Sequence, residues 1–179
     1  MAAFEFPEYY ALPPFFTLQV NETSRENQTR WWRELILGYA QHTGEYHLEV
    51  QAALDSPLCH NAAIGRRLDA DALVYFLNDL VKTRNAEWEN AERTMVLLMP
   101  QTPEEVAQDV YDWVVDAGMI GDVLTVYELH SGDSSVGTSF HGSDPTLVLR
   151  ALDVLAAQGK AKVFSASSPE DAGVKFFAA

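Results

Sequence analysis

The chain repeats itself at an interval of 75 residues, and this repeat narrows the folds that it can adopt. An apolar stripe at helical spacing and the strand-like segment behind it recur together in one register. The residues concerned are Leu73, Phe76, Leu77, Leu80, Ala86 and Trp88, and their counterparts are Val148, Ala151, Leu152, Leu155, Ala161 and Val163. A matched stripe alone is weak evidence, whereas a stripe and a strand in one register favour an internal duplication.

Local signals around the first copy predict three helices and a hairpin. Asn21 or Thr23 can cap a first helix that extends to about His42, and Gly44 ends it. The remaining elements are expected as a short strand at 46–50, a short helix at 56–67, a helix after the cap Asp69, a left-handed residue at Asn85, and a hairpin formed by 86–88 and 94–99.

The second copy shows the same order of signals. Residues Thr102-Pro103-Glu104-Glu105 combine a capping threonine, a proline at the first helical position and a glutamate at the third. The later elements are expected as a segment starting at 123–129, a mobile loop at 132–142, a helix opened by Ser143-Asp144-Pro145, and strands at 161–164 and 173–177.

Three helices closed by a hairpin within one such repeat indicate a winged helix, which is a variant of the helix-turn-helix. The predicted fold is therefore α+β and mostly helical, with two winged helices in tandem. We expect the domains at 21–100 and 101–179, preceded by an extended arm at 1–20.

The net charge of −14 argues against several classes of ligand. Phosphate backbones and anionic lipid surfaces both attract basic proteins. Neither half of the chain is an exception, since residues 1–100 hold 14 acidic and 8 basic side chains and residues 101–179 hold 12 and 4. Direct binding of nucleic acid or lipid is therefore not expected.

In a winged helix the third helix commonly enters the DNA major groove. The residues that these two helices would expose are Asp69, Asp71, Asn78, Asp79 and Lys82 in the first copy, and Asp144, Arg150 and Asp153 in the second. Such faces are neutral or negative, so a DNA-binding or transcription-associated protein is only the alternative hypothesis. Winged helices that do not read DNA often serve as protein–protein modules.

No pattern of catalytic, metal-binding or phosphate-binding residues stands out. The five histidines lack metal-ligand spacing, and the sequence contains no nucleophile-elbow, Walker or dinucleotide motif. The single cysteine, Cys59, excludes an internal disulfide. No signal peptide or long apolar segment is apparent. We therefore expect a non-enzymatic cytoplasmic protein without cofactors.

The N-terminal segment Phe4–Gln19, FEFPEYYALPPFFTLQ, is rich in aromatic residues and proline. Pro13-Pro14 predicts an extended backbone close to polyproline II. A stiff aromatic segment suits a groove on a partner, because little conformational entropy remains to be lost. An arm that packs on its own domain is equally compatible with these residues. Of the neighbouring pair Trp31-Trp32, one indole is expected in the core and the other over the arm or at a partner.

Several short motifs together resemble one known family along almost the whole chain. They are Pro-Pro-Phe-Phe-Thr-Leu-Gln at 13–19, Asn-Ala-Glu-Trp at 85–88, Val-Tyr-Glu-Leu at 126–129, Phe-His-Gly at 140–142, Leu-Arg-Ala-Leu at 149–152 and Gly-Val-Lys-Phe-Phe at 173–177. The chain resembles the vacuolar protein sorting-associated protein 25 family, the small subunit of the ESCRT-II endosomal sorting complex.

This resemblance implies tandem winged helices and a non-enzymatic role in sorting ubiquitinated membrane cargo to multivesicular bodies. Two copies of such a subunit join two larger winged-helix subunits, each copy through its N-terminal arm. The arm residues that correspond are Phe6, Tyr9, Pro13, Pro14, Phe15 and Phe16. Because this chain has a single proline in Phe6-Pro7-Glu8-Tyr9, the upstream half departs from the double-proline pattern of some members.

The resemblance also implies that the second winged helix recruits the first ESCRT-III subunit. For this contact we predict the face around Val123, Thr125 and Tyr127. The chain would then lie on the cytosolic face of endosomal membranes, held there indirectly by its partners. On this hypothesis, removal of residues 1–16, or replacement of Phe15 and Phe16 by alanine, leaves a folded chain that no longer joins the larger subunits.

Overall fold

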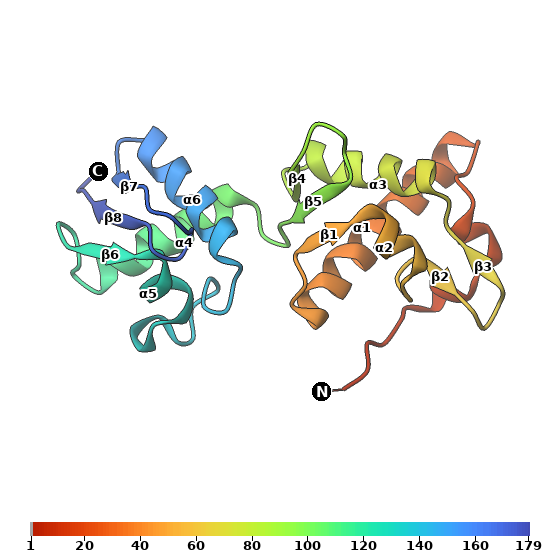
Figure 1. Cartoon of the computed structure of the whole chain (residues 1–179), viewed down its shortest axis with the longest axis horizontal. Helices are drawn as coiled ribbons and strands as arrows, with labels where there is room; N and C mark the ends of the chain where they lie inside the picture. The colour runs from red at the N-terminus through yellow and green to blue at the C-terminus, as the bar shows by residue number, and fades with distance from the viewer. Residues whose placement is uncertain (1) are drawn as a thin grey trace. The chain divides into compact units, whose positions relative to one another are not determined.

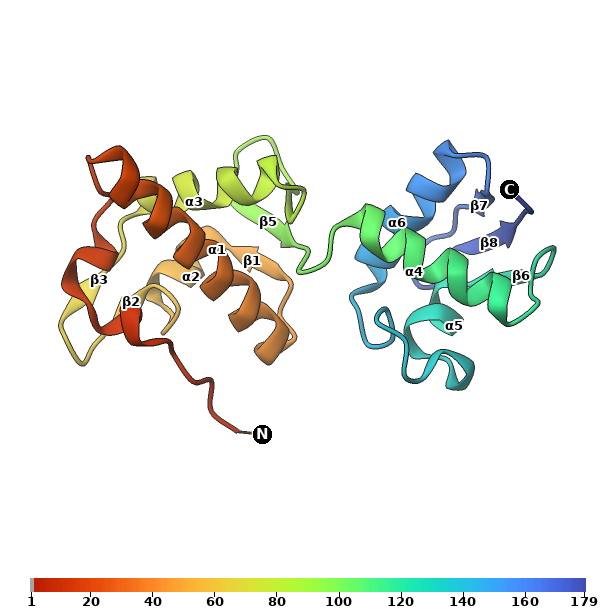
Figure 2. The ribbon, with the colours of Figure 1, turned by 180° about the vertical axis from the view of Figure 1, so that it is seen from behind.

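A computed structural model describes residues 2–179 of the protein (Figures 1 and 2). The chain divides into two compact units, Met1–Pro100 and Gln101–Ala179. The N-terminal segment belongs to the first unit. Each unit contains its own helices and its own three-stranded antiparallel sheet.

Unit 1 follows the winged-helix order predicted for the first copy. Its elements are α1 Glu22–Thr43, β1 His47–Glu49, α2 Val50–Asp55, β2 His60–Asn61, β3 Arg66–Arg67, α3 Ala70–Lys82, β4 Ala86–Trp88 and β5 Met95–Leu98. The sheet order is β1-β5-β4, so the hairpin strand β5 lies between its partner β4 and the distant β1.

The ends of α1 follow from its terminal residues. The side chain of Asn21 accepts a hydrogen bond from the backbone N of Ser24 at 3.0 Å, which satisfies one of the free donors of the first turn. At the other end Gly44 adopts φ 73°, a left-handed conformation that lacks a steric penalty only for glycine. The predicted helix and its cap are confirmed.

Two expectations for unit 1 are wrong. Residues 56–67 do not form a helix, because α2 ends at Asp55 and the following segment forms the ribbon β2–β3. The left-handed residue after α3 is Arg84, with φ 67°, and not Asn85. Asn85 instead donates from its side chain to the carbonyl oxygen of Met99 at 3.0 Å, which ties the end of α3 to the end of β5.

Unit 2 repeats this architecture. Its elements are α4 Pro103–Asp116, β6 Val123–Thr125, α5 Val126–Ser131, the 3-10 turn η3 Asp133–Ser135, α6 Pro145–Ala157, β7 Ala161–Phe164 and β8 Gly173–Phe176. The sheet order is β6-β8-β7, which matches the order of the first sheet. The capping box predicted at Thr102 and Glu105 is present.

The predicted repeat of 75 residues is present in the structure. Helices α3 and α6 start and end 75 residues apart and each begins after a capping aspartate, Asp69 or Asp144. The side chain of Asp69 accepts from the backbone N of Ala72, and that of Asp144 accepts from the backbone N of Thr146, each at 2.8 Å. The fold is therefore two tandem winged helices, as the sequence predicts.

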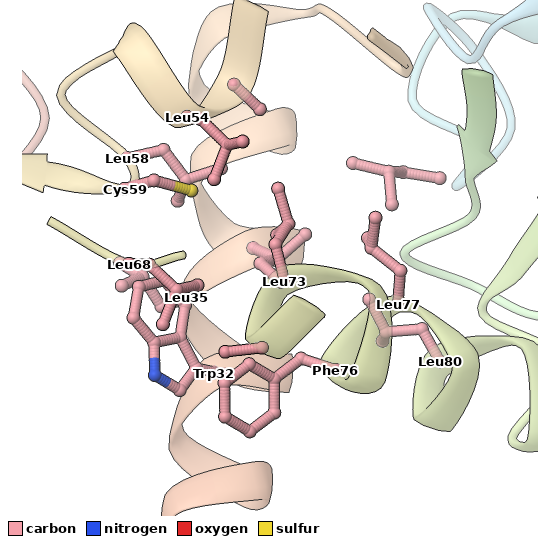
Figure 3. Packing of buried hydrophobic residues seen from close by; sticks show 14 of the residues in the cluster. Trp32, Leu35, Leu54, Leu58, Cys59, Leu68, Leu73, Phe76, Leu77 and Leu80 are labelled. Carbon is pink, nitrogen blue, oxygen red and sulfur yellow. The ribbon is translucent and has the colours of Figure 1, made fainter. Parts of the chain in front are cut away.

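The core of unit 1 lies between α1, α2 and α3 (Figure 3). Trp32 from α1 is fully buried and stacks on Phe76 from α3, with ring centroids 5.5 Å apart. Leucines from α1, α2 and α3, and Leu58 and Leu68 on either side of the ribbon, belong to the same buried cluster. In unit 2 the segment 132–142, expected as a mobile loop, contributes the buried Phe140, whose ring lies edge-on to Trp113 of α4 at 5.5 Å.

Candidate interaction surfaces

The N-terminal segment is not extended where extension was predicted. Residues Glu8–Ala11 and Pro13–Phe16 form two 3-10 helices, η1 and η2. The backbone N of Phe15 donates to the carbonyl of Leu12 at 3.0 Å, whereas polyproline II has no such internal bonds. Proline is compatible with this geometry because its fixed φ suits the first residues of a helical turn.

The second correction concerns Phe15 and Phe16. Each side chain is only 3% exposed. The ring of Phe15 stacks on Trp32 with centroids 4.3 Å apart and an interplanar angle of 2°, and the indole Nε1 donates to the Phe15 carbonyl at 2.9 Å. Both rings belong to the core of their own unit and leave little surface for a partner while the unit is folded.

A buried glutamine fastens this segment to α1. The side-chain amide of Gln28 donates to the carbonyls of Phe15 at 3.0 Å and Thr17 at 2.8 Å. Its side-chain oxygen accepts from the backbone N of Gln19 at 3.0 Å. Sequence reasoning missed this residue, because a single glutamine in a long helix carries no pattern that distinguishes it from a solvated one.

The upstream residues Phe6 and Tyr9 are half-buried against their own unit. Tyr9 stacks on Trp31 with centroids 5.0 Å apart, and its hydroxyl donates to the Trp31 carbonyl at 3.2 Å. Phe6 stacks on Tyr10 at 4.0 Å. One indole of the pair, Trp32, lies in the core as predicted, and the other, Trp31, covers the arm, which was one of the two predicted alternatives.

Tyr10 joins the N-terminal segment to the β2–β3 ribbon. Its hydroxyl donates to the carbonyl of Pro57, and its own carbonyl accepts from the side chain of Asn61 at 2.9 Å. Burial raises the pKa of the Tyr10 hydroxyl from its ordinary 10.0 to about 12. The ribbon therefore contacts the N-terminal segment through Asn61 of β2.

What remains exposed is a short apolar ridge, Leu12-Pro13-Pro14, at the junction of the two 3-10 helices. The side chain of Leu12 is 51% exposed and both prolines are exposed. A hollow of about 270 Å³ adjoins the ridge and is lined by Leu12, Pro14, Phe15, Gln19, Ser24, Asn27, Gln28 and Trp31. Of the predicted docking residues, only Pro13 and Pro14 lie fully on this surface.

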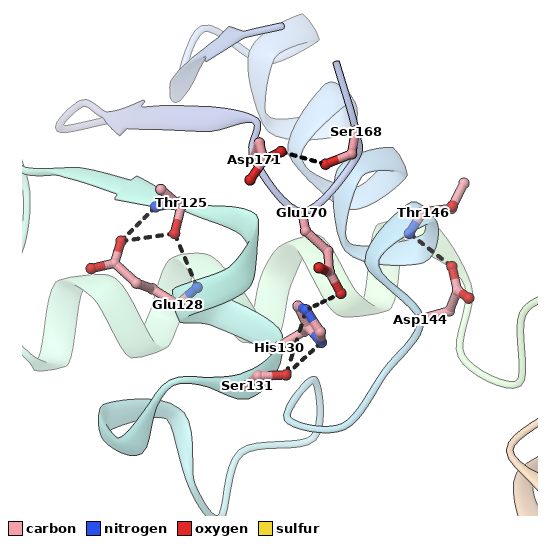
Figure 4. A network of polar contacts seen from close by, with 9 residues as sticks. All are labelled: Thr125, Glu128, His130, Ser131, Asp144, Thr146, Ser168, Glu170 and Asp171. Carbon is pink, nitrogen blue, oxygen red and sulfur yellow. Dashed lines mark hydrogen bonds and ion pairs between the residues drawn. The ribbon is translucent and has the colours of Figure 1, made fainter. Parts of the chain in front are cut away.

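In unit 2 the predicted contact residues divide into two kinds. Val123 and Tyr127 are 60% and 55% exposed. Thr125 instead caps α5, because its hydroxyl accepts from the backbone N of Glu128 at 3.1 Å and its own backbone N donates to the Glu128 carboxylate at 2.6 Å (Figure 4). Thr125 therefore positions the two exposed residues on either side of it.

The sheet of unit 2 adds basic residues that sequence reasoning missed. Val123 of β6 lies opposite Lys175 of β8, which in turn lies opposite Lys162 of β7. The ammonium group of Lys162 lies 5.4 Å from the ring centroid of Phe164, which is itself 43% exposed. This face thus combines two lysines with exposed apolar side chains in an otherwise acidic unit. The alternation along β7 and β8 could have indicated it.

The described residues, 2–179, contain no group of three side chains that could hold a metal ion. None of the helices among them is both long and apolar enough to cross a bilayer. The buried thiol of Cys59 has its pKa raised from 9.0 to about 12 by burial, so it stays protonated and weakly reactive.

Comparison with known proteins decides the family. A family model described as "ESCRT-II complex subunit" matches residues 9–144. Over 175 residues the chain is 38% identical to vacuolar protein-sorting-associated protein 25 of Danio rerio, covering 98% of this chain and 99% of the relative. The chain belongs to this family of ESCRT-II subunits. Its identity to the Homo sapiens member is 36% over 175 residues, with 98% of both chains covered.

Solved structures agree with the fold of this ESCRT-II family member. A crystal structure of subunit VPS25 of the ESCRT-II complex superimposes with a TM-score of 0.80 at 20% identity, covering 95% of this chain and 97% of that chain. A chain in the crystal structure of the endosomal complex ESCRT-II (VPS22/VPS25/VPS36) gives 0.78 at 22% identity, covering 95% and 98%. At these identities the likeness supports the tandem winged-helix fold.

Proposed function

We propose that the protein is a non-enzymatic subunit of an endosomal ESCRT-II complex, in which unit 1 docks on the larger winged-helix subunits and unit 2 recruits the first ESCRT-III subunit. Two copies serve each complex in sorting ubiquitinated membrane cargo to multivesicular bodies. The chain works in the cytoplasm on the cytosolic face of endosomes and reaches the membrane through its partners. Family membership supports the complex, and the surfaces described above support the two contacts.

The observation that carries the docking proposal is the exposed ridge Leu12-Pro13-Pro14 on a rigid base. The aromatic rings on either side of it are buried or stacked, so the ridge is held in place before any partner arrives. A pre-ordered apolar projection loses little entropy on binding. Phe6 and Tyr9 retain partly exposed edges beside it and extend the proposed contact.

For the ESCRT-III contact, Val123 of β6 and Tyr127 of the adjoining α5 are exposed apolar residues four positions apart. Val123 is the cross-strand neighbour of Lys175, and Lys175 is the cross-strand neighbour of Lys162. Such a face favours a partner segment with apolar and acidic side chains, because burial of apolar area and charge complementarity act together. Thr125, half-buried between Val123 and Tyr127, caps α5 and stays at the edge of the proposed contact.

The docking test replaces Leu12 with aspartate. A charge on the ridge should lower the affinity for the larger subunits by about tenfold or more, since burying one leucine contributes about 1.5–3 kcal/mol. Val20→Asp is the matched control, because Val20 is 92% exposed and lies outside the ridge. Co-purification with VPS22 and VPS36 homologues is measured. Equal recovery of both variants would contradict the docking proposal.

Deletion of residues 1–16 is not a clean test of docking, contrary to the sequence-based expectation. It would remove Phe15 and Phe16 from the core and expose Trp32. A loss of partner binding would then report unfolding of unit 1 rather than the absence of a contact.

The recruitment test combines Val123→Asp with Tyr127→Ala. These changes should weaken binding of the first ESCRT-III subunit while assembly with VPS22 and VPS36 continues. Val136→Asp is the control, because Val136 is an apolar residue of the same unit that is 66% exposed and lies on a different loop. If the control and the double variant bind ESCRT-III alike, the proposed face is wrong.

A further inference from the structure

The turn between β7 and β8 of unit 2 carries a serine that the proposed contacts do not use. The last pair of the β7–β8 ladder is Phe164 and Gly173, so residues 165–172 lie outside it. Ser167, Pro169, Glu170 and Asp171 are exposed, and Ser168 is half-buried among them. The side chain of Ser168 donates to the carboxylate of Asp171 at 2.7 Å (Figure 4).

This turn also supports the start of α5. The carbonyl of Glu170 accepts from the backbone N of Tyr127 at 3.0 Å, and the carbonyl of Ala172 accepts from the backbone N of Val126 at 2.9 Å. The Glu170 carboxylate lies 3.3 Å from Nε2 of His130, whose exposed fraction is 8%. The turn and α5 are therefore joined by two backbone hydrogen bonds and one side-chain contact.

Ser168 is followed by Pro169, and only two other serine- or threonine-proline pairs occur in the chain, at Ser56 and Thr102. Ser56 ends α2, and its carbonyl accepts from the backbone N of Cys59 and of His60. Thr102 caps α4, and Pro103 behind it is buried. Of the three, Ser168 alone is followed by an exposed proline outside any helix end, where a peptide-binding cleft can reach it.

We propose that Ser168 is a phosphorylation site for a proline-directed serine kinase, and that the phosphate loosens the turn from α5. In the transfer, Oγ of Ser168 bonds to the γ-phosphorus of ATP and the bond from that phosphorus to the β,γ-bridging oxygen breaks. ADP leaves, and the hydroxyl proton passes to the kinase's base. Pro169 supplies the recognition element, because it fixes φ and lacks a backbone donor.

The expected structural effect follows from charge. Phosphorylation removes the hydroxyl proton that Ser168 donates to Asp171, and it places about −1.5 to −2 charges beside that carboxylate. Glu170 is the next carboxylate along the turn. Because the phosphate repels both carboxylates, the turn changes its conformation. The hydrogen bonds that the carbonyls of Glu170 and Ala172 accept from α5 then weaken.

The first experiment tests the site. The full chain is incubated with a proline-directed kinase and MgATP, and the phosphopeptides are mapped by mass spectrometry. One phosphoryl group is expected, on Ser168. Ser168→Ala should abolish its incorporation, and Ser167→Ala, the matched control one residue away, should not. Absence of phosphate at Ser168 in the wild-type chain, or equal incorporation into Ser168→Ala, overturns the assignment.

The second experiment tests the loosening, by amide hydrogen exchange of the phosphorylated and unphosphorylated chains. The amides of Val126 and Tyr127 should exchange about fivefold faster or more after phosphorylation. The amide of Val50, bonded to the Thr94 carbonyl in unit 1, should not change. The Ser168→Ala variant lacks the hydroxyl and gains no charge, so its exchange rates show the effect of losing the hydroxyl alone. Unchanged exchange at both α5 amides in the phosphorylated chain would overturn the coupling.

Discussion

At the scale of single residues, Phe15 and Phe16 show that the apolar character of a side chain does not decide whether it is buried in its own domain or exposed. Their apolar character and the prolines before them suit a docking peptide and a core segment equally. Phe15 lies flat on Trp32, and Phe16 lies edge-on to the same indole at 5.9 Å. These rings therefore stabilise unit 1, and the exposed part of the segment is Leu12 with the two prolines.

Phe15→Ala should destabilise unit 1 by about 3–5 kcal/mol, because it removes a buried ring and leaves a cavity against Trp32. Leu12→Ala, three residues away on the exposed ridge, should change the free energy of unfolding by less than about 1 kcal/mol. Urea denaturation followed by tryptophan fluorescence measures both. Similar small effects for the two variants would show that Phe15 is not part of the core.

Alkaline pH should destabilise the protein through Tyr10 and Cys59. Burial raises the pKa of Tyr10 from 10.0 to about 12 and that of Cys59 from 9.0 to about 12, so the folded state holds these protons more tightly than the unfolded state. Their contribution is fully present below about pH 9 and is lost as pH rises towards 12. Melting temperatures measured across this range should fall, and less steeply in Tyr10→Phe.

At the scale of elements, α1 is the helix on which the N-terminal segment packs. Its capping by Asn21 and its end at Gly44 are local and predictable. Its inner face, by contrast, meets segments from before and after it in the sequence. Gln28 is the polar link in this arrangement, since its side chain satisfies backbone groups on both sides of Thr17.

Gln28→Leu should destabilise unit 1 by about 1–3 kcal/mol, although leucine is the more apolar residue. The backbone N of Gln19 would lose its acceptor, and an unsatisfied donor is costly. The carbonyl of Phe15 would lose the Gln28 amide and keep only the Trp32 indole as donor. Asn27→Leu, the neighbouring exposed position on α1, is the control. A higher melting temperature of the Gln28→Leu variant would contradict the stabilising role of the Gln28 hydrogen bonds.

At the scale of the whole molecule, the duplication gives two units with separate cores. Unit 1 centres on Trp32 and Phe76, and unit 2 packs Phe140 against Trp113. The units differ in what surrounds the shared winged helix. Unit 1 has the N-terminal segment and the ribbon β2–β3, and unit 2 has the segment 132–142 between α5 and α6.

Residues 1–100 and 101–179, expressed separately, should each fold cooperatively, because every buried cluster described lies within one unit. Circular dichroism and near-ultraviolet spectra of the fragments should together account for those of the full chain. A fragment that lacks a cooperative transition would show that its core depends on the other unit.

Periodicity in the sequence was enough to predict the two winged helices, their repeat and the caps at Asn21, Asp69 and Thr102, because each depends on residues a few positions apart. It failed at residues 56–67, where strand pairing between His60 and Arg67 replaces a helix. It also failed to find Gln28 and the lysines of the second sheet. These act through neighbours that are distant in the sequence or that lie on adjacent strands.

The sequence by itself determined the tandem fold and the family, since these follow from spacing and motifs. Only the tertiary structure decided which part of the N-terminal segment faces outward. The same apolar residues gain free energy from burial in their own core or in a partner's groove. The position of Trp32 and the clamp by Gln28 decide between the two, burying Phe15 and Phe16 and leaving Leu12-Pro13-Pro14 exposed.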